Sequence, residues 1–324
     1  MSVAPRVPSI SWQARWAELL LRLTVKRRMA PEVDLPALRD RCQSVDRRRF
    51  RVPADATRTP AVCDGVPCEW LTVPSSGPER VLLYLHGGGF ALRLPHLYAR
   101  FAARMARALQ ARVLLADYRL APEHPFPAGA DDCLAAYRWL LGQGVAPHHI
   151  VLGGDSAGAN LALATLLAAK AAGLPRPACA FVISPPVDLT LASPSVVDNE
   201  RSDALFRLAT LLLLRRHYVD AERVLHPLVS PLFADLAGLP PLLLQAGTRE
   251  MLRDDAVRYA ERARAAGVEV ELELRHGMQH CFQLLESLPE SGRAIETIAR
   301  FVRRHMDEVP CDLPARAADR VACR

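Results

Sequence analysis

Short runs of Val, Leu and Ile alternate with longer stretches of helical periodicity along most of this chain. The apolar runs cover residues 69–74, 81–85, 113–118, 150–153, 178–184, 242–246 and 270–275. Helical patterns lie between them at 97–110, 130–142, 157–172, 254–266 and 290–307. Several of the runs are too apolar to have a solvent face, so we expect buried parallel strands. The alternation therefore predicts the α/β class, with a mostly parallel central sheet flanked by helices on both faces.

One long segment breaks this alternation. Residues 187–238 lie between two predicted strands and contain "LFRLATLLLLRRHYV" at 205–219, which is typical of a helix that is apolar over much of its surface. Ligands of such sheets bind at the carboxyl ends of the strands. An insertion at this edge is well placed to cover a binding site, so we interpret residues 187–238 as a helical cap.

A separate helical pattern occupies residues 12–23, where large apolar side chains recur on one face. These side chains are Trp12, Trp16, Leu19, Leu20 and Leu23. The opposite face carries Arg15, Glu18, Arg22 and Lys26. We expect the apolar stripe to lie against the rest of the protein or over a pocket, with a membrane surface as the alternative partner.

The composition narrows the protein class. A chain of 324 residues fits one large α/β domain. Its apolar runs fall short of the roughly 20 residues that cross a bilayer, and its opening residues do not resemble a signal peptide. We therefore expect a soluble cytoplasmic protein that makes, at most, weak contact with a membrane surface.

Charge and cysteine usage exclude two further classes. The net charge of +6 comes largely from "KRR" at 26–28 and "RRRFR" at 47–51. No aromatic-interleaved basic motif accompanies these runs, so no nucleic-acid partner is expected. The eight cysteines are scattered, which favours reduced thiols. Cys63 and Cys68 do not have the usual C-x-x-C spacing of zinc sites, so we expect no metal.

The segment "GGDSAGAN" at 153–160 carries the first candidate for chemistry. It follows the apolar run at 150–153 and begins the next helical pattern, so Ser156 lies at a sharp turn between a strand and a helix. Cβ atoms at positions 154 and 158 would collide with neighbouring backbone in such a turn. The pattern predicts that Ser156 is a nucleophile whose oxygen stands free above the sheet, with the start of the helix presenting N–H groups to a developing negative charge.

An acyl-transfer serine needs donors for the oxyanion, and "LYLHGGGF" at 83–90 provides a candidate directly after a predicted strand. Consecutive glycines let the backbone approach a ligand closely. We expect the N–H groups of Gly87 and Gly88 to form this oxyanion hole together with that of Ala157. Phe90 and Asp155, which lie beside these motifs, are candidates for substrate binding.

The candidate base is His280 in "RHGMQHCF", in the loop after the last predicted strand. His276 is the competitor, but it falls at the end of the strand, where the pleat fixes its side chain. The acid is expected in "TREMLRDD", after the strand at 242–246. Glu250 lies nearest to the strand and is favoured, with Asp254 as the alternative, because acidic residues that precede a helical pattern are typical of its first turn.

Several of these segments together resemble the hormone-sensitive-lipase family of α/β-hydrolases, the bacterial class IV carboxylesterases. They are "HGGGF", "DYRLAPEHPFPA" at 117–128, "GDSAGANLA", "SPPVDLT" at 184–190, "GLPPLLLQAG" and "GVEVELELRHGMQHCF". The resemblance covers roughly residues 60–305. It implies an α/β-hydrolase fold with Ser156 as nucleophile and His280 as base. Glu250 departs from the family pattern, since it stands where most members have Asp, and Asp254 matches the second acid of the family's loop.

The resemblance also implies how the chain is divided and what it does. The N-terminal segment 1–55 and the insertion 187–238 are expected to form the cap. Residues 56–186 and 239–308 would form the hydrolase core, and 309–324 a C-terminal tail. The implied reaction is hydrolysis of short- to medium-chain carboxylic esters through an acyl-enzyme, without a cofactor, by a possible homodimer. A lipase, an amidase or a non-catalytic small-molecule receptor on the same scaffold are the alternatives.

Overall fold

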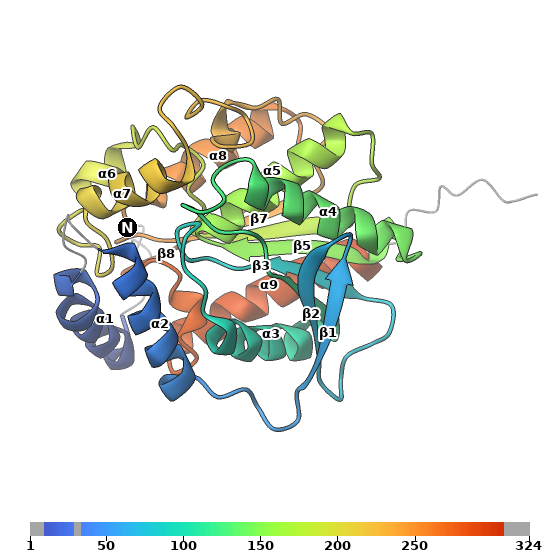
Figure 1. Cartoon of the computed structure of the whole chain (residues 1–324), viewed down its shortest axis with the longest axis horizontal. Coiled ribbons are helices and arrows are strands. Elements are labelled where there is room, and N and C mark those ends of the chain that lie inside the picture. Colours follow the sequence, from blue (N-terminus) through green and yellow to red (C-terminus); the bar gives the residue numbers. More distant parts are fainter. Residues whose placement is uncertain (1–9, 29–33, 308–324) are drawn as a thin grey trace, which may run out of the picture.

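An eight-stranded sheet crosses the centre of the molecule in the order β1-β2-β4-β3-β5-β6-β7-β8 (Figure 1). The computed structural model describes residues 10–28 and 34–307. The strands are β1 Thr57–Cys63, β2 Val66–Thr72, β3 Val81–Leu85, β4 Arg112–Ala116, β5 Ile150–Asp155, β6 Cys179–Ile183, β7 Leu242–Gly247 and β8 Val270–Arg275. Strand β2 pairs antiparallel with both β1 and β4, and the other neighbours are parallel. The predicted mostly parallel α/β sheet is confirmed.

Burial explains why most strands were recognisable in the sequence. Every residue of β3, β5, β6 and β7 is buried, as expected of central parallel strands covered on both faces. Strand β1 was not predicted. It lies at the edge of the sheet, its first four residues are exposed, and it contains Pro60, so its sequence lacks an apolar run.

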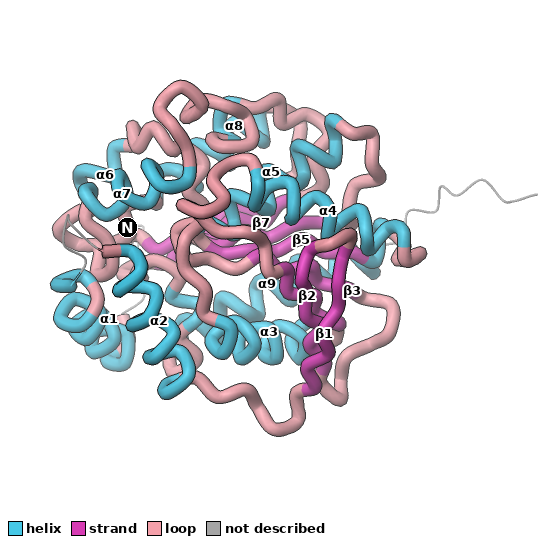
Figure 2. Tube along the Cα trace, in the orientation of Figure 1, coloured by secondary structure: helices cyan, strands magenta, loops and turns pink. Residues whose placement is uncertain are grey.

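Helices cover both faces of the sheet (Figure 2). Helices α4 (Ala128–Gly142), α5 (Ala157–Ala171) and α8 (Arg253–Ala265) contribute to one hydrophobic core. Helices α3 (Pro95–Leu109) and α9 (Pro289–Asp307) form a second core on the opposite face. Helix α5 is buried almost all round, which fits its continuous Ala and Leu sequence. The sheet thus forms the middle layer between two layers of helices.

The remaining helices gather at one end of the sheet, on the left of Figure 1. They are α1 (Trp12–Thr24), α2 (Leu35–Arg49), α6 (Pro194–Asp198) and α7 (Leu208–Tyr218). Short 3-10 turns lie at η1 Lys26–Arg28, η2 Pro147–His149, η3 Pro231–Phe233 and η4 Phe282–Leu284. Leu35 of α2 and Leu214 of α7 pack together on Ala91 and Leu92, shortly after β3. The two segments of the predicted cap, 1–55 and 187–238, therefore meet over the carboxyl end of the sheet.

The exact division of the chain into core and cap stays a prediction. Helices α6 and α7 lie between β6 and β7, inside the interval 187–238 that broke the alternation. Helices α1 and α2 lie inside the interval 1–55. The predicted C-terminal tail at 309–324 lies outside the described residues.

The expectation that the apolar stripe of α1 faces the protein is wrong. Trp12 and Trp16 are 68% and 58% exposed, and Leu20 is 56% exposed. The helix instead turns the face that carries the small side chain of Ala14 toward the protein, and Ala14 is its buried residue. The small side chain allows a close approach to a cluster that contains Met278 and Phe282, which helical periodicity alone did not reveal.

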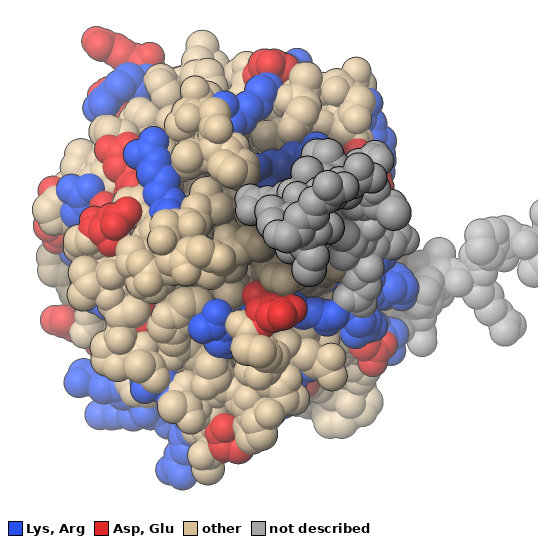
Figure 3. All heavy atoms as spheres, turned by 90° about the vertical axis from the view of Figure 1, so that its right-hand side faces the viewer, with Lys and Arg blue, Asp and Glu red and all other residues tan. Residues whose placement is uncertain are grey.

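Within the described residues, charges of both signs are mixed on the surface (Figure 3) and the cysteines form no disulfide. On the face shown in Figure 3, Lys and Arg side chains are interspersed with Asp and Glu. The cysteines within residues 10–28 and 34–307 are free, and in these ranges no group of three His, Cys, Asp or Glu residues could hold a metal ion. None of the described helices is long and apolar enough to span a bilayer.

Candidate active site

Ser156 occupies a sharp turn between β5 and α5. Its backbone lies at φ 50° and ψ −124°, in the left-handed half of conformational space that non-glycine residues rarely enter. A Cβ atom on Gly154 would lie 2.4 Å from the carbonyl oxygen of Gly158, and one on Gly158 would lie 2.0 Å from that of Leu85. The predicted collisions at positions 154 and 158 are confirmed. Gly154 and Gly158 therefore allow Ser156 to adopt its strained backbone conformation at the end of β5.

We predict that Gly158→Ala destabilises the protein by about 3 kcal/mol, because the new Cβ would meet the backbone oxygens of Leu85 and His86 and neither can move alone. Urea unfolding measures the change. Gly142→Ala is the matched control, since a Cβ there meets nothing within 4 Å and helix α4 gains stability from alanine. Equal unfolding midpoints for Gly158→Ala and the unaltered chain would contradict the steric argument.

His280 and Glu250 form a buried pair, and His280 lies close enough to Asp155, the residue before Ser156, for their charges to interact. His280 lies in the loop after β8, and Glu250 lies in the loop after β7. His280 Nδ1 is 3.1 Å from Glu250 Oε2. The other carboxylate oxygen, Oε1, accepts a hydrogen bond from the N–H of Gly247 at 3.2 Å. Within the described residues His280 Nε2 is buried and has no hydrogen-bond partner. The carboxylate thus orients the imidazole and leaves one nitrogen available to accept a proton.

The structure separates the alternatives that the sequence left open. Asp254 lies in the first turn of α8, as expected, where its carboxylate accepts from Ser195 N–H at 2.9 Å and from Arg253 Nε at 2.6 Å. Asp255 is buried and accepts from the N–H of Val187 at 2.8 Å. Neither aspartate is bonded to His280 in the described part of the chain. His276 is exposed, so it is also unsuited to a sheltered site.

The charge of Glu250 changes the acidity of the imidazole. Burial is the largest single effect and would lower the pKa of His280, while the hydrogen bond and the charge of Glu250 raise it. The charges of Asp203 and Asp155 act in the same direction, so the pKa of His280 is raised above its ordinary value. The site therefore favours the imidazolium that forms when His280 takes a proton.

The oxyanion prediction needs a correction at Gly87. Its N–H donates to Asp155 Oδ1 at 3.0 Å, so it is already engaged inside the protein. In contrast, the N–H groups of Gly88, Gly89 and Ala157 donate to no acceptor among the described residues. The available donors are thus Gly88, Gly89 and Ala157, because Asp155 already accepts the hydrogen bond of the Gly87 N–H.

The prediction that Asp155 binds substrate is also wrong. Asp155 is 1% exposed and its carboxylate accepts from Tyr84 Oη at 2.8 Å, from Tyr98 Oη at 2.9 Å and from Gly87 N–H. Burial, only partly offset by these three donors, raises the pKa of Asp155 above its usual range. Asp155 therefore holds the glycine loop in place from beneath.

Two aromatic contacts fix the same loop from its other sides. His86 stacks on Tyr118, its Nδ1 lies 2.7 Å from the carbonyl oxygen of Gly87, and burial lowers the pKa of His86 to about 4, so it is neutral. Phe90 stacks on Tyr218 at the end of α7, with ring centroids 3.7 Å apart. Phe90 is thus a contact between the loop and the cap, and its role in substrate binding stays a prediction.

The sequence reasoning missed Asp203 and Phe206, which connect the cap to His280. The Phe206 ring lies edge-on to the His280 ring, with 4.9 Å between centroids. Asp203 Oδ1 accepts from the N–H of Phe206 at 2.9 Å, and Oδ2 accepts from the N–H of Met251 at 2.9 Å, directly after Glu250. In the sequence Asp203 is an isolated acid in the cap, and no motif distinguishes it.

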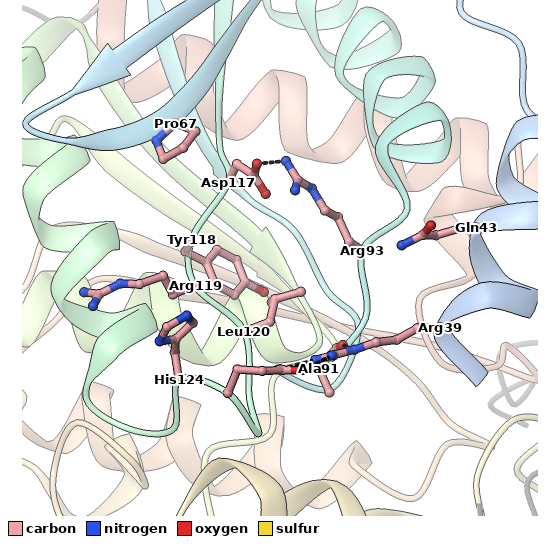
Figure 4. A pocket seen from close by; sticks show the side chains of 11 residues that line it. Arg39, Gln43, Pro67, Ala91, Arg93, Asp117, Tyr118, Arg119, Leu120 and His124 are labelled. Atoms are coloured by element: carbon pink, nitrogen blue, oxygen red, sulfur yellow. Dashed lines mark hydrogen bonds and ion pairs between the residues drawn. The ribbon is translucent and has the colours of Figure 1, made fainter. Parts of the chain in front are cut away.

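A cavity of about 440 Å³ is lined by residues of α2, of the segment after β3 and of the segment after β4 (Figure 4). Its lining includes Tyr118 and three arginines, and none of its residues belongs to the Ser156, His280 and Glu250 set. Arg93 is paired with Asp117, Arg39 donates to both oxygens of Glu123, and Arg119 is paired with Asp132. These pairings leave the cavity without a free charge for a ligand, so we assign the chemistry to the Ser156 site.

Comparison with known proteins gives a consistent set of relatives. Residues 82–284 match a family model described as the alpha/beta hydrolase fold. An "Acetyl-hydrolase" of Streptomyces hygroscopicus is 42% identical over 236 residues, 72% of this chain and 79% of the relative. An "Esterase" of Acinetobacter venetianus is 36% identical over an alignment that covers 90% of this chain and 96% of the relative. A crystal structure of an esterase from the bacterial hormone-sensitive lipase family superposes with a TM-score of 0.86 at 37% identity, covering 92% of this chain and all of the other.

Proposed function

The chain belongs to the hormone-sensitive-lipase family of α/β-hydrolases, and from this premise we propose that Ser156, His280 and Glu250 carry out its chemistry as nucleophile, base and acid. The protein is a serine carboxylic ester hydrolase, as its esterase and acetyl-hydrolase relatives show. The observation that supports these residue roles best is the buried pair of Glu250 and His280, whose Nε2 is unpartnered within the described residues.

Acylation follows from this arrangement. His280 Nε2 removes the proton from the hydroxyl of Ser156 while Oγ attacks the ester carbonyl carbon. The carbonyl oxygen becomes an oxyanion, which the N–H groups of Gly88, Gly89 and Ala157 stabilise. As the C–O bond to the alcohol breaks, the imidazolium returns the proton to the leaving oxygen. The alcohol departs and leaves an acyl group on Ser156.

Deacylation repeats these proton transfers with water. His280 takes a proton from the water as its oxygen attacks the acyl carbonyl, and the resulting intermediate collapses to release the carboxylic acid and restore the Ser156 hydroxyl. The raised pKa of His280 favours the imidazolium in both steps. Ser156, His280 and Glu250, together with the oxyanion donors and water, therefore account for the complete cycle.

The preference for short- to medium-chain esters is part of the proposal. Ser156 is 9% exposed, and Leu214 of α7 packs where a Cβ on Gly89 would lie, so the cap closes down on the glycine loop. A long acyl chain would have to displace these contacts. The acetyl-hydrolase among the relatives points in the same direction.

Assembly and cellular location also belong to the proposal. The free cysteines of the described residues favour a reducing compartment such as the cytoplasm. A homodimer rests on analogy with the fold. Weak contact with a membrane surface would involve the exposed face of α1.

We predict that p-nitrophenyl acetate and butyrate are hydrolysed rapidly, with kcat/KM about tenfold or more above that for the palmitate ester. Initial rates across the series, from acetate to palmitate, measure this preference. Acetyl p-nitroanilide tests an amide with the same acyl group, and we expect far slower turnover. Preference for palmitate would refute the chain-length proposal, and a folded protein inert on every ester would refute the residue roles.

A further inference from the structure

Helix α1 presents its largest apolar side chains to solvent. The exposed fractions are 68% for Trp12, 58% for Trp16, 44% for Leu19, 56% for Leu20 and 52% for Leu23. At 100° per residue these five positions fall within a single arc of the helix. A contiguous apolar surface of this kind on a soluble protein marks a binding face.

Directed polar contacts fix this orientation. Arg22 donates to the carbonyl oxygens of Arg201 and Ser202 at 2.8 and 2.5 Å, and Lys26 Nζ donates to that of Asp203 at 2.7 Å. At the start of the helix, the hydroxyl of Ser11 donates to Glu290 at 2.9 Å. The helix is therefore anchored by its polar side at both ends. Turning the apolar stripe inward would break each of these bonds.

The charge beside the stripe is positive. Glu18 is the single acidic residue in the range 10–28, and it faces inward, where it pairs with Arg22 and Arg249. Arg15 and Arg27 are exposed and have no acidic partner among the described residues. The exposed surface of residues 10–27 thus combines the apolar stripe of α1 with two cations, Arg15 on α1 and Arg27 on the following turn η1, and shows no outward acidic group.

We propose that this face of α1 binds an anionic lipid surface. Trp and Leu side chains insert at the boundary between headgroups and acyl chains, and arginines at the edge of such a helix attract anionic headgroups. A second copy of the chain matches these features less well. A two-fold contact through the same patch would bring the arginines of both copies to one interface.

The position of α1 links such binding to the active site without depending on the proposed catalytic roles. The inner face of α1 contacts Met278 and Phe282, on either side of His280 in the loop after β8. A protein bound through α1 would hold this loop close to the lipid surface. Esters that partition into that surface would then reach the cap at a raised local concentration.

The experiment measures co-sedimentation of the full chain with vesicles of phosphatidylglycerol or phosphatidylcholine. We expect binding to the anionic vesicles, a blue shift of tryptophan fluorescence, and weaker binding at about 0.5 M salt. The double substitution Trp12→Gln with Trp16→Gln should weaken binding about tenfold or more. Val62→Gln is the control, because Val62 is 66% exposed but lies on the edge strand β1.

Circular dichroism and hydrolysis of dissolved p-nitrophenyl acetate should be the same for the double variant and the unaltered chain, since neither tryptophan contacts the Ser156 site. No binding of the unaltered chain to phosphatidylglycerol vesicles would overturn the proposal. Equal binding by the double variant would do the same. If light scattering shows a dimer that the double variant converts to a monomer while vesicle binding persists, a second copy covers this face instead.

Discussion

Ser156→Ala is expected to lower kcat for p-nitrophenyl butyrate by about 10⁵- to 10⁶-fold. The substitution removes the oxygen that becomes acylated, and the remaining oxyanion donors cannot replace it. The fold should survive, because the N–H of Ser156 keeps its hydrogen bond to the carbonyl oxygen of Ile183 at 2.8 Å and alanine adopts the same backbone angles at a similar cost. Steady-state rates and a urea unfolding curve measure the two properties separately.

Ser76→Ala is the matched control for this substitution. The Ser76 hydroxyl donates to the carbonyl oxygen of Ala111 and accepts from the N–H of Val73, so it supports a turn after β2. We expect near-normal kcat for this variant. Substantial ester turnover by purified Ser156→Ala would show that another group attacks the ester. Labelling with a phosphonate ester, followed by mass spectrometry, would then identify that group.

Glu250→Gln is expected to lower kcat by about 10³- to 10⁴-fold and to shift the pH profile. His280 must be neutral to accept the proton of Ser156, so activity falls as the pH falls through the pKa of His280. Glu250 raises that pKa, which places the acid limb of the unaltered enzyme above the ordinary value of 6.5. Gln removes the charge, so the pKa falls and the acid limb moves to lower pH. Rates measured across a pH series give both effects.

Asp254→Asn provides the comparison that separates the two candidate acids. Asp254 contacts Ser195 and Arg253, so its neutralisation should leave the position of the acid limb unchanged. A loss of activity with Asp254→Asn that matches the loss expected for Glu250→Gln, while Glu250→Gln stays active, would reverse the assignment. An unshifted acid limb in Glu250→Gln would contradict the stated electrostatic coupling to His280.

The sequence by itself determined the features that arise from local physics. The apolar run at 81–85 coincides with β3, where every residue is buried, because the burial of a strand shows in its side-chain types. The sharp turn at Ser156 was predictable from the sequence for a similar reason. Steric exclusion of Cβ at 154 and 158 acts within a few residues of the turn and on the strand beside it. The resemblance to the family added the prediction of His280 as the base and of the two cap segments.

Only the tertiary structure decided which groups meet across the fold. The pairing of Glu250, and not Asp254, with His280 depends on how the loops after β7 and β8 lie beside each other. Asp155 engages the N–H of Gly87, 68 residues earlier, and so moves the free donors to Gly88 and Gly89. Helix α1 faces outward with its tryptophans because polar groups near residues 200–203 hold its other side. Hydrogen-bond partners are chosen by the packing of distant segments, and residue type and spacing along the chain do not contain that geometry.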